Sequence, residues 1–279
     1  MNKILNFAIL GCGRISKSHI QAIIKEEKRC NLIAICDESL ENLNTTFNYV
    51  KEEFFKNSIN FDLLKFKSLE DLLHAHNNKQ INIDLLIICT PSGMHCEQTI
   101  KAAKSKINIC TEKPMALNVK DCMKMIKTCK EKNVRLFVVK QNRLNTTLQD
   151  LKRKIENGMF GKIGIISLNV FWHRPQSYYD QADWRGTAKF DGGALMNQAS
   201  HYVDLLEWLI GPIESVSSFV NTISRKIEVE DTAVLNLKWI EGILGTMSVT
   251  MISYPKNIEG SITIIGDKGS AKVGGEALN

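Results

Sequence analysis

Long hydrophobic runs are missing from this chain of 279 residues. No apolar stretch approaches the length of a transmembrane helix, and the first residues lack the apolar segment and small-residue cleavage site of a signal peptide. The formal net charge is +6, yet no run of basic residues interleaved with aromatic ones occurs. We therefore expect no membrane and no nucleic acid among the partners, and the mild basic excess suits an anionic substrate.

Paired cysteines are missing as well. All eight cysteines lie in the first half of the chain, and none forms a Cys-x-x-Cys pair. This distribution fits neither a disulfide framework nor a zinc site, so we expect reduced thiols, a cytoplasmic protein and no metal. Internal repeats and low-complexity linkers are also lacking, and the composition of 44% apolar and 24% charged residues is that of a globular protein.

A strand, a glycine-rich turn and a helix open the chain. The apolar run 7–10 stops at Gly11, Gly13 follows, and 15–25 has the pattern of a helix. In a doubly wound sheet such a turn holds a pyrophosphate against backbone N–H groups at the positive end of the helix. Gly11 permits the tight turn and Gly13 a close approach of the phosphates. Ser16 stands where the G-x-G-x-x-G motif has its third glycine, and it is small enough for helix and strand to pack.

The next strand ends at an acid. Residues 32–36 are apolar and Asp37 follows, roughly two dozen residues after the glycines, where a carboxylate can accept hydrogen bonds from an adenosine ribose. Asp37 favours NAD because it would repel a 2′-phosphate. Ser39, close by, leaves room for NADP.

Apolar runs and amphipathic segments alternate through about residue 140. This alternation predicts an α/β fold, a doubly wound parallel sheet with right-handed crossovers. Ser68 and Asp71 indicate the N-cap of its third helix. We expect strands at 4–10, 32–36, 63–66, 84–89, 107–110 and 135–139, and helices at 15–25, 40–55, 69–75, 94–104 and 119–132.

After about residue 143 the pattern changes to an α+β one. A helix at 144–157 precedes a β-type run at 163–172 and a polar, aromatic-rich loop, and a second helix spans 194–209. The later strands, 213–223, 232–239, 243–252 and 261–265, alternate as in an antiparallel sheet. The sequence thus predicts two domains, 1–140 and 141–279, and we expect a short or truncated C-terminus because no closing helix follows the last strand.

Three short polar stretches each follow a predicted strand of the first domain. They are Thr90-Pro91 with His95, Glu112-Lys113-Pro114, and Gln141-Asn142-Arg143. Loops at the carboxyl ends of parallel strands line the ligand crevice. An amine at Lys113, held near a nicotinamide, can orient a substrate hydroxyl or take part in proton transfer.

A histidine on the helix at 194–209 is the second candidate for proton transfer. Asn197 and His201 are four residues apart and so share a helix face, while the apolar Leu195, Leu205, Leu206 and Leu209 suffice for the core. The preceding turn with Gly192-Gly193 lets backbone approach a ligand. Histidine can hold a neutral base near pH 7, which suits removal of a proton from an alcohol.

Together these stretches resemble the Gfo/Idh/MocA family of NAD(P)-dependent sugar oxidoreductases over essentially the whole chain. The resemblance implies an N-terminal Rossmann domain and a C-terminal domain with a large, mostly antiparallel sheet whose outer face forms homo-oligomers, either dimers or tetramers. Its matching residues are Gly11-Cys12-Gly13-Arg14-Ile15, Asp37, Thr90-Pro91 with His95, Glu112-Lys113-Pro114, Gln141-Asn142-Arg143 and the helix with His201.

The same resemblance implies the site residues. Lys113 and His201 form the catalytic pair, and either is a possible base. The cofactor contacts are Gly11, Gly13, Arg14, Ile15, Asp37, Thr90, His95 and Glu112. The substrate candidates are Arg143, Arg174, Tyr179, Trp184, Arg185, Asn197 and Gln198.

One departure from the family pattern points to a subgroup. Many members have an aspartate four residues before the histidine, where this chain has Asn197, and a cationic His201 is held less strongly without that carboxylate. Segments 174–180, 184–187 and 195–208 are similar to bacterial nucleotide-sugar 3-dehydrogenases that act on UDP-N-acetylglucosaminuronate in surface-polysaccharide synthesis.

The implied enzyme is therefore an NAD-dependent sugar dehydrogenase. It would oxidise the 3-hydroxyl of a UDP-N-acetylhexosamine or of its uronic acid. Two alternatives stay open: a dehydrogenase of a free sugar or inositol, and a non-catalytic protein of the same fold that senses a sugar or cofactor.

Overall fold

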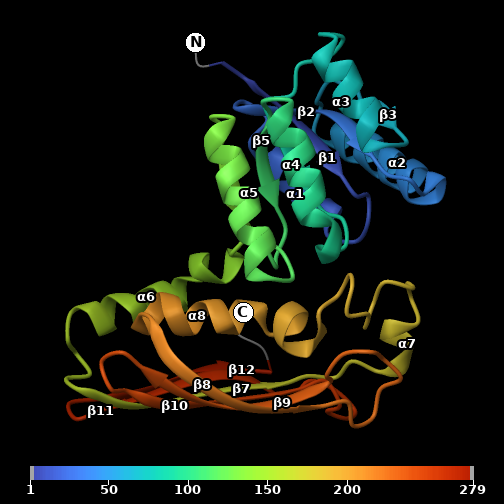
Figure 1. The fold of residues 1–279 in the computed structure, drawn as a ribbon. Helices are drawn as coiled ribbons and strands as arrows, with labels where there is room; N and C mark the ends of the chain where they lie inside the picture. The colour runs from blue at the N-terminus through green and yellow to red at the C-terminus, as the bar shows by residue number, and fades with distance from the viewer. Residues whose placement is uncertain (1–2, 277–279) are drawn as a thin grey trace. The chain divides into compact units, whose positions relative to one another are not determined.

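The computed structural model describes residues 3–276. The last three residues, on which the expectation about the C-terminus partly rests, lie outside this range. The chain forms two compact units, Met1–Val139 and Lys140–Asn279. Each is built on one six-stranded sheet (Figure 1). None of the helices described is both long and apolar enough to cross a membrane.

The first unit is a parallel sheet with the strand order β3-β2-β1-β4-β5-β6. The strands are β1 (Leu5–Leu10), β2 (Cys30–Cys36), β3 (Leu64–Phe66), β4 (Leu85–Ile88), β5 (Asn108–Thr111) and β6 (Leu136–Val138). Between them lie α1 (Ser16–Lys25), α2 (Leu40–Lys56), α3 (Leu69–Asn77), η1 (Ser92–Met94), α4 (His95–Lys104) and α5 (Val119–Glu131).

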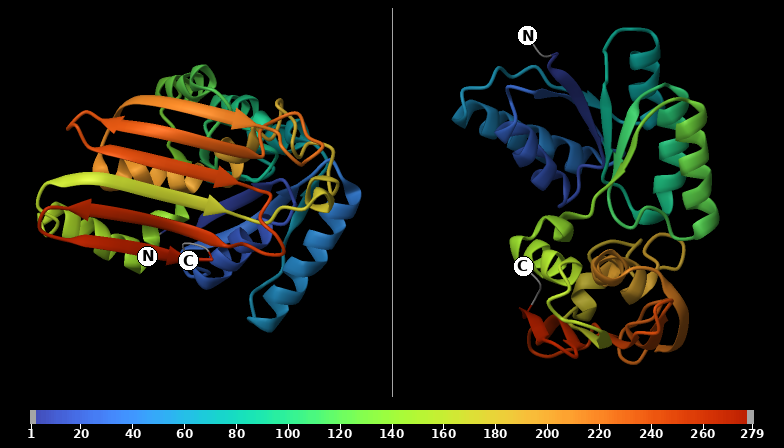
Figure 2. Two further views of the ribbon diagram at one scale, coloured as in Figure 1. Left: turned by 90° about the horizontal axis from the view of Figure 1, so that it is seen from below. Right: turned by 90° about the vertical axis from the view of Figure 1, so that its left-hand side faces the viewer.

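Helices cover both faces of this sheet, as the right-hand view of Figure 2 shows. Successive residues of β1 point to opposite faces, so Ala8 and Leu10 join the core under α3 and α4, while Ile9 joins the core under α1 and α2. The predicted cap is confirmed, because the Ser68 hydroxyl accepts a hydrogen bond from the Asp71 backbone N–H at 3.1 Å. The predicted doubly wound α/β fold is confirmed.

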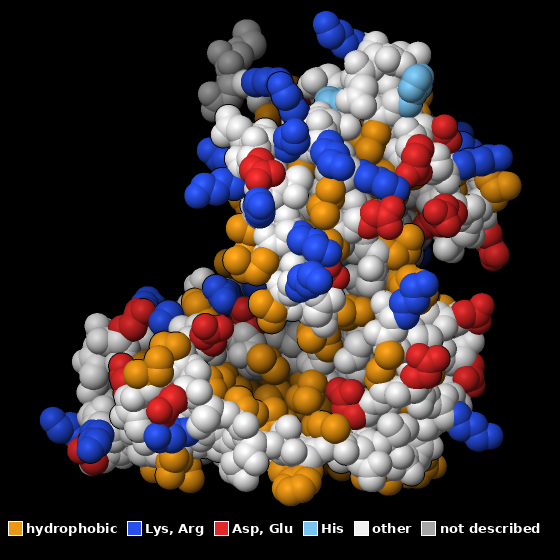
Figure 3. All heavy atoms as spheres, viewed as in Figure 1, with side chains coloured by type: hydrophobic (Ala, Val, Ile, Leu, Met, Phe, Trp, Pro, Cys, Tyr) orange, Lys and Arg blue, Asp and Glu red, His pale blue; other side chains and the backbone are white. Residues whose placement is uncertain are grey.

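On the face that Figure 3 shows, the basic side chains of the first unit come from several elements. In the view of Figure 3, Lys and Arg side chains lie among Asp and Glu side chains. Lys101, for example, lies 2.7 Å from the carboxylates of both Glu70 and Glu97. Such interspersed charge adds solubility more than a binding surface.

The second unit is a mixed sheet with the strand order β12-β11-β7-β10-β9-β8. Only the pair β7–β10 is parallel; the other pairs are antiparallel, as predicted. The strands are β7 (Ile163–Phe171), β8 (Ile213–Asn221), β9 (Thr232–Trp239), β10 (Leu244–Thr250), β11 (Glu259–Gly266) and β12 (Ser270–Gly275). The helical segments are η2 (Gln141–Leu144), α6 (Thr146–Glu156), α7 (Gln176–Tyr179), η3 (Ala194–Gln198) and α8 (Ser200–Ile210).

Helices α6 and α8 cover one face of this sheet. Leu151 of α6, Leu206 of α8 and Leu168 of β7 are at most 3% exposed and share one core. No helix among the described residues covers the outer face, which the left-hand view of Figure 2 presents, and Phe219 of β8 is 82% exposed there. The sheet therefore buries one side and leaves an apolar side open.

The helix expected at 194–209 is interrupted. Residues Ala194–Gln198 form a π-helical turn, in which the Ala199 N–H donates to the Ala194 carbonyl at 2.8 Å, and α8 starts only at Ser200. A π-turn inserts one residue into the helical repeat, which periodicity alone does not reveal. Strand β12 was also not expected from the sequence.

Candidate active site

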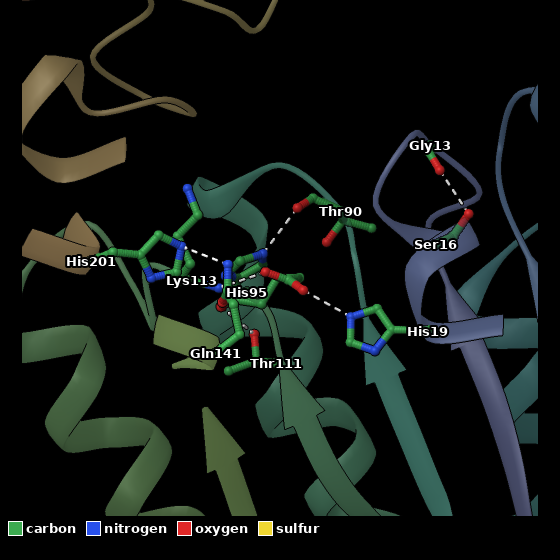
Figure 4. Close-up of polar contacts among 10 residues, drawn as sticks. Gly13, Ser16, His19, Thr90, His95, Thr111, Lys113, Gln141 and His201 are labelled. Atoms are coloured by element: carbon green, nitrogen blue, oxygen red, sulfur yellow. Dashed lines mark hydrogen bonds and ion pairs between the residues drawn. The ribbon is translucent and has the colours of Figure 1, made fainter. Parts of the chain in front are cut away.

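The glycine-rich turn between β1 and α1 has the geometry that a phosphate site requires. Gly11 has φ +93°, and a Cβ there would lie 2.7 Å from the backbone carbon of Cys89, so no other residue fits. Gly13 is exposed and faces open space. Ser16, buried at the third position of the motif, donates its hydroxyl to the Gly13 carbonyl at 2.6 Å (Figure 4).

Asp37 ties the end of β2 to the same turn. One carboxylate oxygen accepts the Cys12 N–H at 2.6 Å and the other accepts the Ser39 N–H at 2.8 Å. Each oxygen keeps a further lone pair for a ribose hydroxyl. Burial and the charge of Asp37 raise the pKa of the Cys12 thiol to about 12, so this cysteine is inert.

The turn fits a dinucleotide. Arg14 and Ile15, the residues between Gly13 and α1, are exposed, and no side chain caps the helix N-terminus. Backbone N–H groups at such an end are available to a pyrophosphate. The cofactor would be held by Gly11, Gly13, Arg14 and Ile15, with Asp37 at the ribose.

The loops after β4 and β5 are joined by His95. Its ring is 1% exposed, with Nε2 2.9 Å from the Thr90 carbonyl (Figure 4). Nδ1 lies 2.9 Å from the Pro114 carbonyl. Burial lowers the pKa of His95. The Thr90 hydroxyl donates to the Gln98 side-chain oxygen at 2.5 Å. His95 thus contacts backbone and fixes two loops that were each expected at the cofactor.

Glu112 anchors the loop that carries Lys113. Its carboxylate is 2.8 Å from Nε2 of His19 and accepts the Lys113 N–H at 3.2 Å (Figure 4). Burial raises the pKa of Glu112, but the hydrogen bonds and charges of His19 and Lys113 together outweigh it and hold that pKa below its usual value. The Lys113–Pro114 peptide bond is cis, and Lys113 is half-buried.

In the second unit, η2 contacts α8 through two side chains that follow β6. Gln141 Nε2 lies 3.0 Å from Nε2 of His201, which is 8% exposed (Figure 4). Nε and Nη2 of Arg143 each donate to the Asp204 carboxylate at 2.7 Å. This ion pair raises the pKa of Arg143. Arg143, expected at the substrate, is thus engaged by Asp204.

A tyrosine hydroxyl brings the other arginines together. The hydroxyl of Tyr178 accepts Nη1 of Arg185 at 2.6 Å and Nε2 of Gln198 at 2.9 Å. Gln198 in turn accepts Nε of Arg174 at 3.2 Å. The Arg185 guanidinium also lies 4.4 Å from the centroid of the Tyr178 ring and 4.7 Å from that of Trp184. We call Arg174, Tyr178, Arg185 and Gln198 the arginine cluster.

The sequence predicts a role at the substrate for the neighbouring residue, Tyr179. Tyr179 is 6% exposed, and burial raises its pKa well above the usual value. Its ring packs edge-on against Tyr178 at 5.1 Å. Adjacent residues on the short helix α7 point in different directions. No pattern in the sequence distinguishes the two tyrosines.

A half-buried acid that the sequence does not single out holds the start of η3. Glu230 accepts the Leu195 N–H at 2.9 Å, and a Cβ on Gly193, whose φ is +94°, would collide with its carboxylate. The glycine at position 193 is therefore required by the close approach of Glu230, whereas the sequence predicts the approach of a ligand at this turn. Burial raises the pKa of Glu230. Asn197 occupies the position where many members of the resembling family have an aspartate, and its side chain donates a hydrogen bond to the carboxylate of Asp191.

Within residues 3–276 no group of three or more His, Cys, Asp or Glu side chains is arranged to hold a metal ion. The site includes the amine of Lys113, the imidazole of His201 and the guanidinium group of Arg185. Such groups bind anions and move protons.

Comparison with known proteins assigns both units to one family. Residues 5–140 match the NAD-binding Rossmann fold of the Gfo/Idh/MocA oxidoreductase family, and residues 148–272 match the Gfo/Idh/MocA C-terminal domain. The WlbA dehydrogenase from Bordetella pertussis, solved in complex with NADH and UDP-GlcNAcA, is 49% identical with a TM-score of 0.92. That match covers 99% of this chain and 81% of the other.

Further relatives are similar at different levels. The WlbA dehydrogenase from Chromobacterium violaceum, also with NADH and UDP-GlcNAcA, is 47% identical with a TM-score of 0.90, over 100% of this chain and 76% of the other. The 2,7-anhydro-N-acetylneuraminate hydratase of Escherichia coli K12 is 27% identical over 68% of this chain and 51% of its own length. The myo-inositol 2-dehydrogenase of Thermotoga maritima is 28% identical over 67% of this chain and 55% of its own length. The aligned region spans about half the length of these two curated relatives. The chain belongs to the Gfo/Idh/MocA family of oxidoreductases, and its N-terminal unit is the family's NAD-binding Rossmann domain.

Proposed function

We propose that the protein oxidises the 3-hydroxyl of a UDP-linked N-acetylhexosaminuronic acid and passes the hydride to NAD. The observation that carries the proposal is the identity of 49% and 47%, over nearly the whole chain, to two dehydrogenases solved with NADH and UDP-GlcNAcA. Relatives at 27–28% identity act on other sugars and cyclitols, so they support the family and not this substrate.

The Rossmann unit would hold the cofactor. In this proposal, Gly11, Gly13, Arg14 and Ile15 receive the pyrophosphate and Asp37 the adenosine ribose. The loops of Thr90 and Glu112 face the nicotinamide half, and His95 acts on both through the backbone that it holds.

The protein side chains would move the proton. NAD supplies the hydride acceptor when it is bound. The hydride leaves C3 of the sugar, the hydroxyl proton goes to Lys113 or His201, and the C–O bond becomes the carbonyl of a 3-keto sugar. A neutral imidazole or amine can accept this proton near pH 7.

The arginine cluster would bind the anionic part of the substrate. The guanidinium groups of Arg174 and Arg185 lie 5.5 Å and 4.4 Å from the centroid of the Tyr178 ring, and Nε of Arg185 is buried without a hydrogen-bond partner among residues 3–276. A carboxylate or diphosphate satisfies such a fork with two parallel bonds. Trp184, Tyr179, Asn197 and Gln198 would shape the site around it, because all four lie in or directly beside this cluster or η3.

The proposal extends to assembly and cellular role. Phe219, Val234 and Leu244 leave an apolar outer sheet face, which suits a homo-oligomer, a dimer or tetramer. Sedimentation analysis tests this, and a monomer at micromolar concentration would contradict it.

We place the enzyme in the cytoplasm, where a 3-keto product would serve an aminotransferase in surface-polysaccharide synthesis.

The experiment is a calorimetric titration of the NAD-loaded protein with UDP-N-acetylglucosaminuronate, UDP-N-acetylglucosamine and UDP, with absorbance of the reduced nicotinamide followed in parallel. We expect binding and reduction with the uronate, and weaker binding with the other two. Lys113→Met and His201→Asn should each lower turnover at least about a hundredfold, while Lys120→Met and His74→Asn, at exposed positions, should not.

Other outcomes discriminate between the alternatives. Turnover with inositol or a free sugar, and none with the nucleotide sugars, would identify the protein as a dehydrogenase of a free sugar or inositol. Cofactor binding with no turnover of any sugar would favour a sensing protein.

A further inference from the structure

Two side chains of η2 reach successive turns of α8. Gln141 contacts His201, and Arg143 holds the carboxylate of Asp204, three residues further along the helix. Lys140 adds a second cation, with Nζ 3.5 Å from the same carboxylate. The bidentate ion pair fixes the position of α8 against η2, so the amide of Gln141 meets the His201 ring at a set place.

The Gln141 contact specifies a protonation state. Its side-chain nitrogen is a donor only, and it lies 3.0 Å from Nε2 of His201. In a neutral imidazole one nitrogen donates and the other accepts. A donor at Nε2 therefore requires the Nε2 lone pair, which places the ring proton on Nδ1.

We propose that Gln141 is a positioning residue that sets the tautomer of His201 and thereby makes Nε2 the atom that accepts the substrate proton. The inference rests on the proposed function for its consequence in turnover. Gln141 is exposed, whereas His201 is buried, so the amide can leave while the ring stays. During oxidation the substrate hydroxyl takes the place of the amide, its proton bonds to Nε2, and the ring then carries a proton on each nitrogen.

The test exchanges the donor for an acceptor. In Gln141→Glu a carboxylate faces Nε2 and can only accept, so His201 must carry its proton on Nε2 or become cationic. Nitrogen NMR of the ¹⁵N-histidine-labelled full-length protein should show the Nδ1-protonated pattern in the wild type and its loss in Gln141→Glu. His201→Asn identifies the signal. Gln149→Glu, an exposed glutamine of α6, is the matched control and should leave the His201 signal unchanged.

Kinetics supply the second readout. Turnover of Gln141→Glu should fall about tenfold or more at pH 7. The pH at which turnover rises, as the histidine becomes neutral, should move higher, because a carboxylate beside the ring raises the pKa of His201. Gln141→Leu should retain the wild-type pH midpoint more closely. An unchanged His201 spectrum in Gln141→Glu would overturn the inference. Absence of turnover in the wild type would overturn the proposed function but leave the spectra as a separate test.

Discussion

The two units hold their functional loops by different means. In the Rossmann unit most of these contacts run to backbone, with Glu112–His19 as an exception: Gly11 lies against the peptide of Cys89, and both ring nitrogens of His95 meet carbonyl oxygens. In the second unit they run mainly between side chains, as in the pairs Arg143–Asp204 and Arg185–Tyr178. Backbone contacts tolerate few residue types, whereas side-chain pairs can be exchanged together. This difference suits a family in which the cofactor is constant and the substrate varies.

Gly11→Ala tests the backbone side of the comparison and should have the largest effect. The positive φ and the collision with the Cys89 peptide together should cost about 2–6 kcal/mol of unfolding free energy. Urea denaturation measures this. Gly13→Ala is the matched control, since its Cβ meets open space. It should leave stability nearly unchanged and weaken NAD binding, and equal stability of the two variants would contradict the comparison.

Asp231 is an exception within the second unit, because it holds backbone there. Its buried carboxylate accepts the N–H groups of Ile223, Ser224 and Arg225 at 2.9–3.0 Å. Asp231→Asn should therefore cost about 1–3 kcal/mol, the range for leaving a buried donor unsatisfied. If the loss instead matches that of an exposed asparagine substitution, backbone bracing is unimportant in this unit.

The pH dependence gives this prediction a sign. Burial raises the pKa of Asp231, but the three backbone hydrogen bonds outweigh it and hold the pKa below its usual value. The carboxylate thus contributes stability above about pH 4, the unfolded pKa, and this stability is lost as pH falls through the folded pKa. Unfolding of the wild type should weaken on acidification more than that of Asp231→Asn. Glu230 should have the opposite effect, because its raised pKa means that the ionised carboxylate destabilises the fold at neutral pH. On acidification the wild type should therefore gain stability relative to Glu230→Gln.

Arg185→Met tests the side-chain half of the comparison, with the smallest expected effect. Loss of the guanidinium should raise KM for UDP-N-acetylglucosaminuronate about tenfold to thirtyfold, as for removal of one charged hydrogen-bonding group, with little change in kcat. Arg153→Met, at an exposed position of α6, is the control. An equal rise in KM for NAD would place Arg185 at the cofactor instead.

Local patterns predicted much of the first unit. The turn at Gly11, the cap at Ser68 and the strand-helix alternation depend on neighbours in sequence, so propensity and periodicity detect them. The spacing from the glycines to Asp37 predicts a carboxylate at the adenosine ribose, because the fold fixes that distance. The hydrogen bond from the Cys12 N–H to Asp37 joins the ends of two neighbouring strands, and the sequence does not indicate it.

Contacts in the second unit were harder to predict. Nothing in the sequence pairs Arg143 with Asp204 or places Tyr178 rather than Tyr179 at the arginines, since both depend on how η2 and α7 are oriented. Glu230 reaches η3 across 35 positions, and the π-turn that it supports differs from an α-helix by a single residue. The sequence therefore indicated which residue types matter without indicating their partners.

The central position of β7 has a consequence for how the second unit folds. Its Ile165 pairs with Leu244 of β10 on one side and with Ile265 of β11 on the other. On a ribosome, β7 therefore emerges well before either neighbour is made, while the β1–β2 pair of the Rossmann sheet can already close. Long-range pairings of this kind slow folding and leave strand edges exposed meanwhile. The Rossmann unit should be complete first, and β7 should wait with open edges for the strands that flank it.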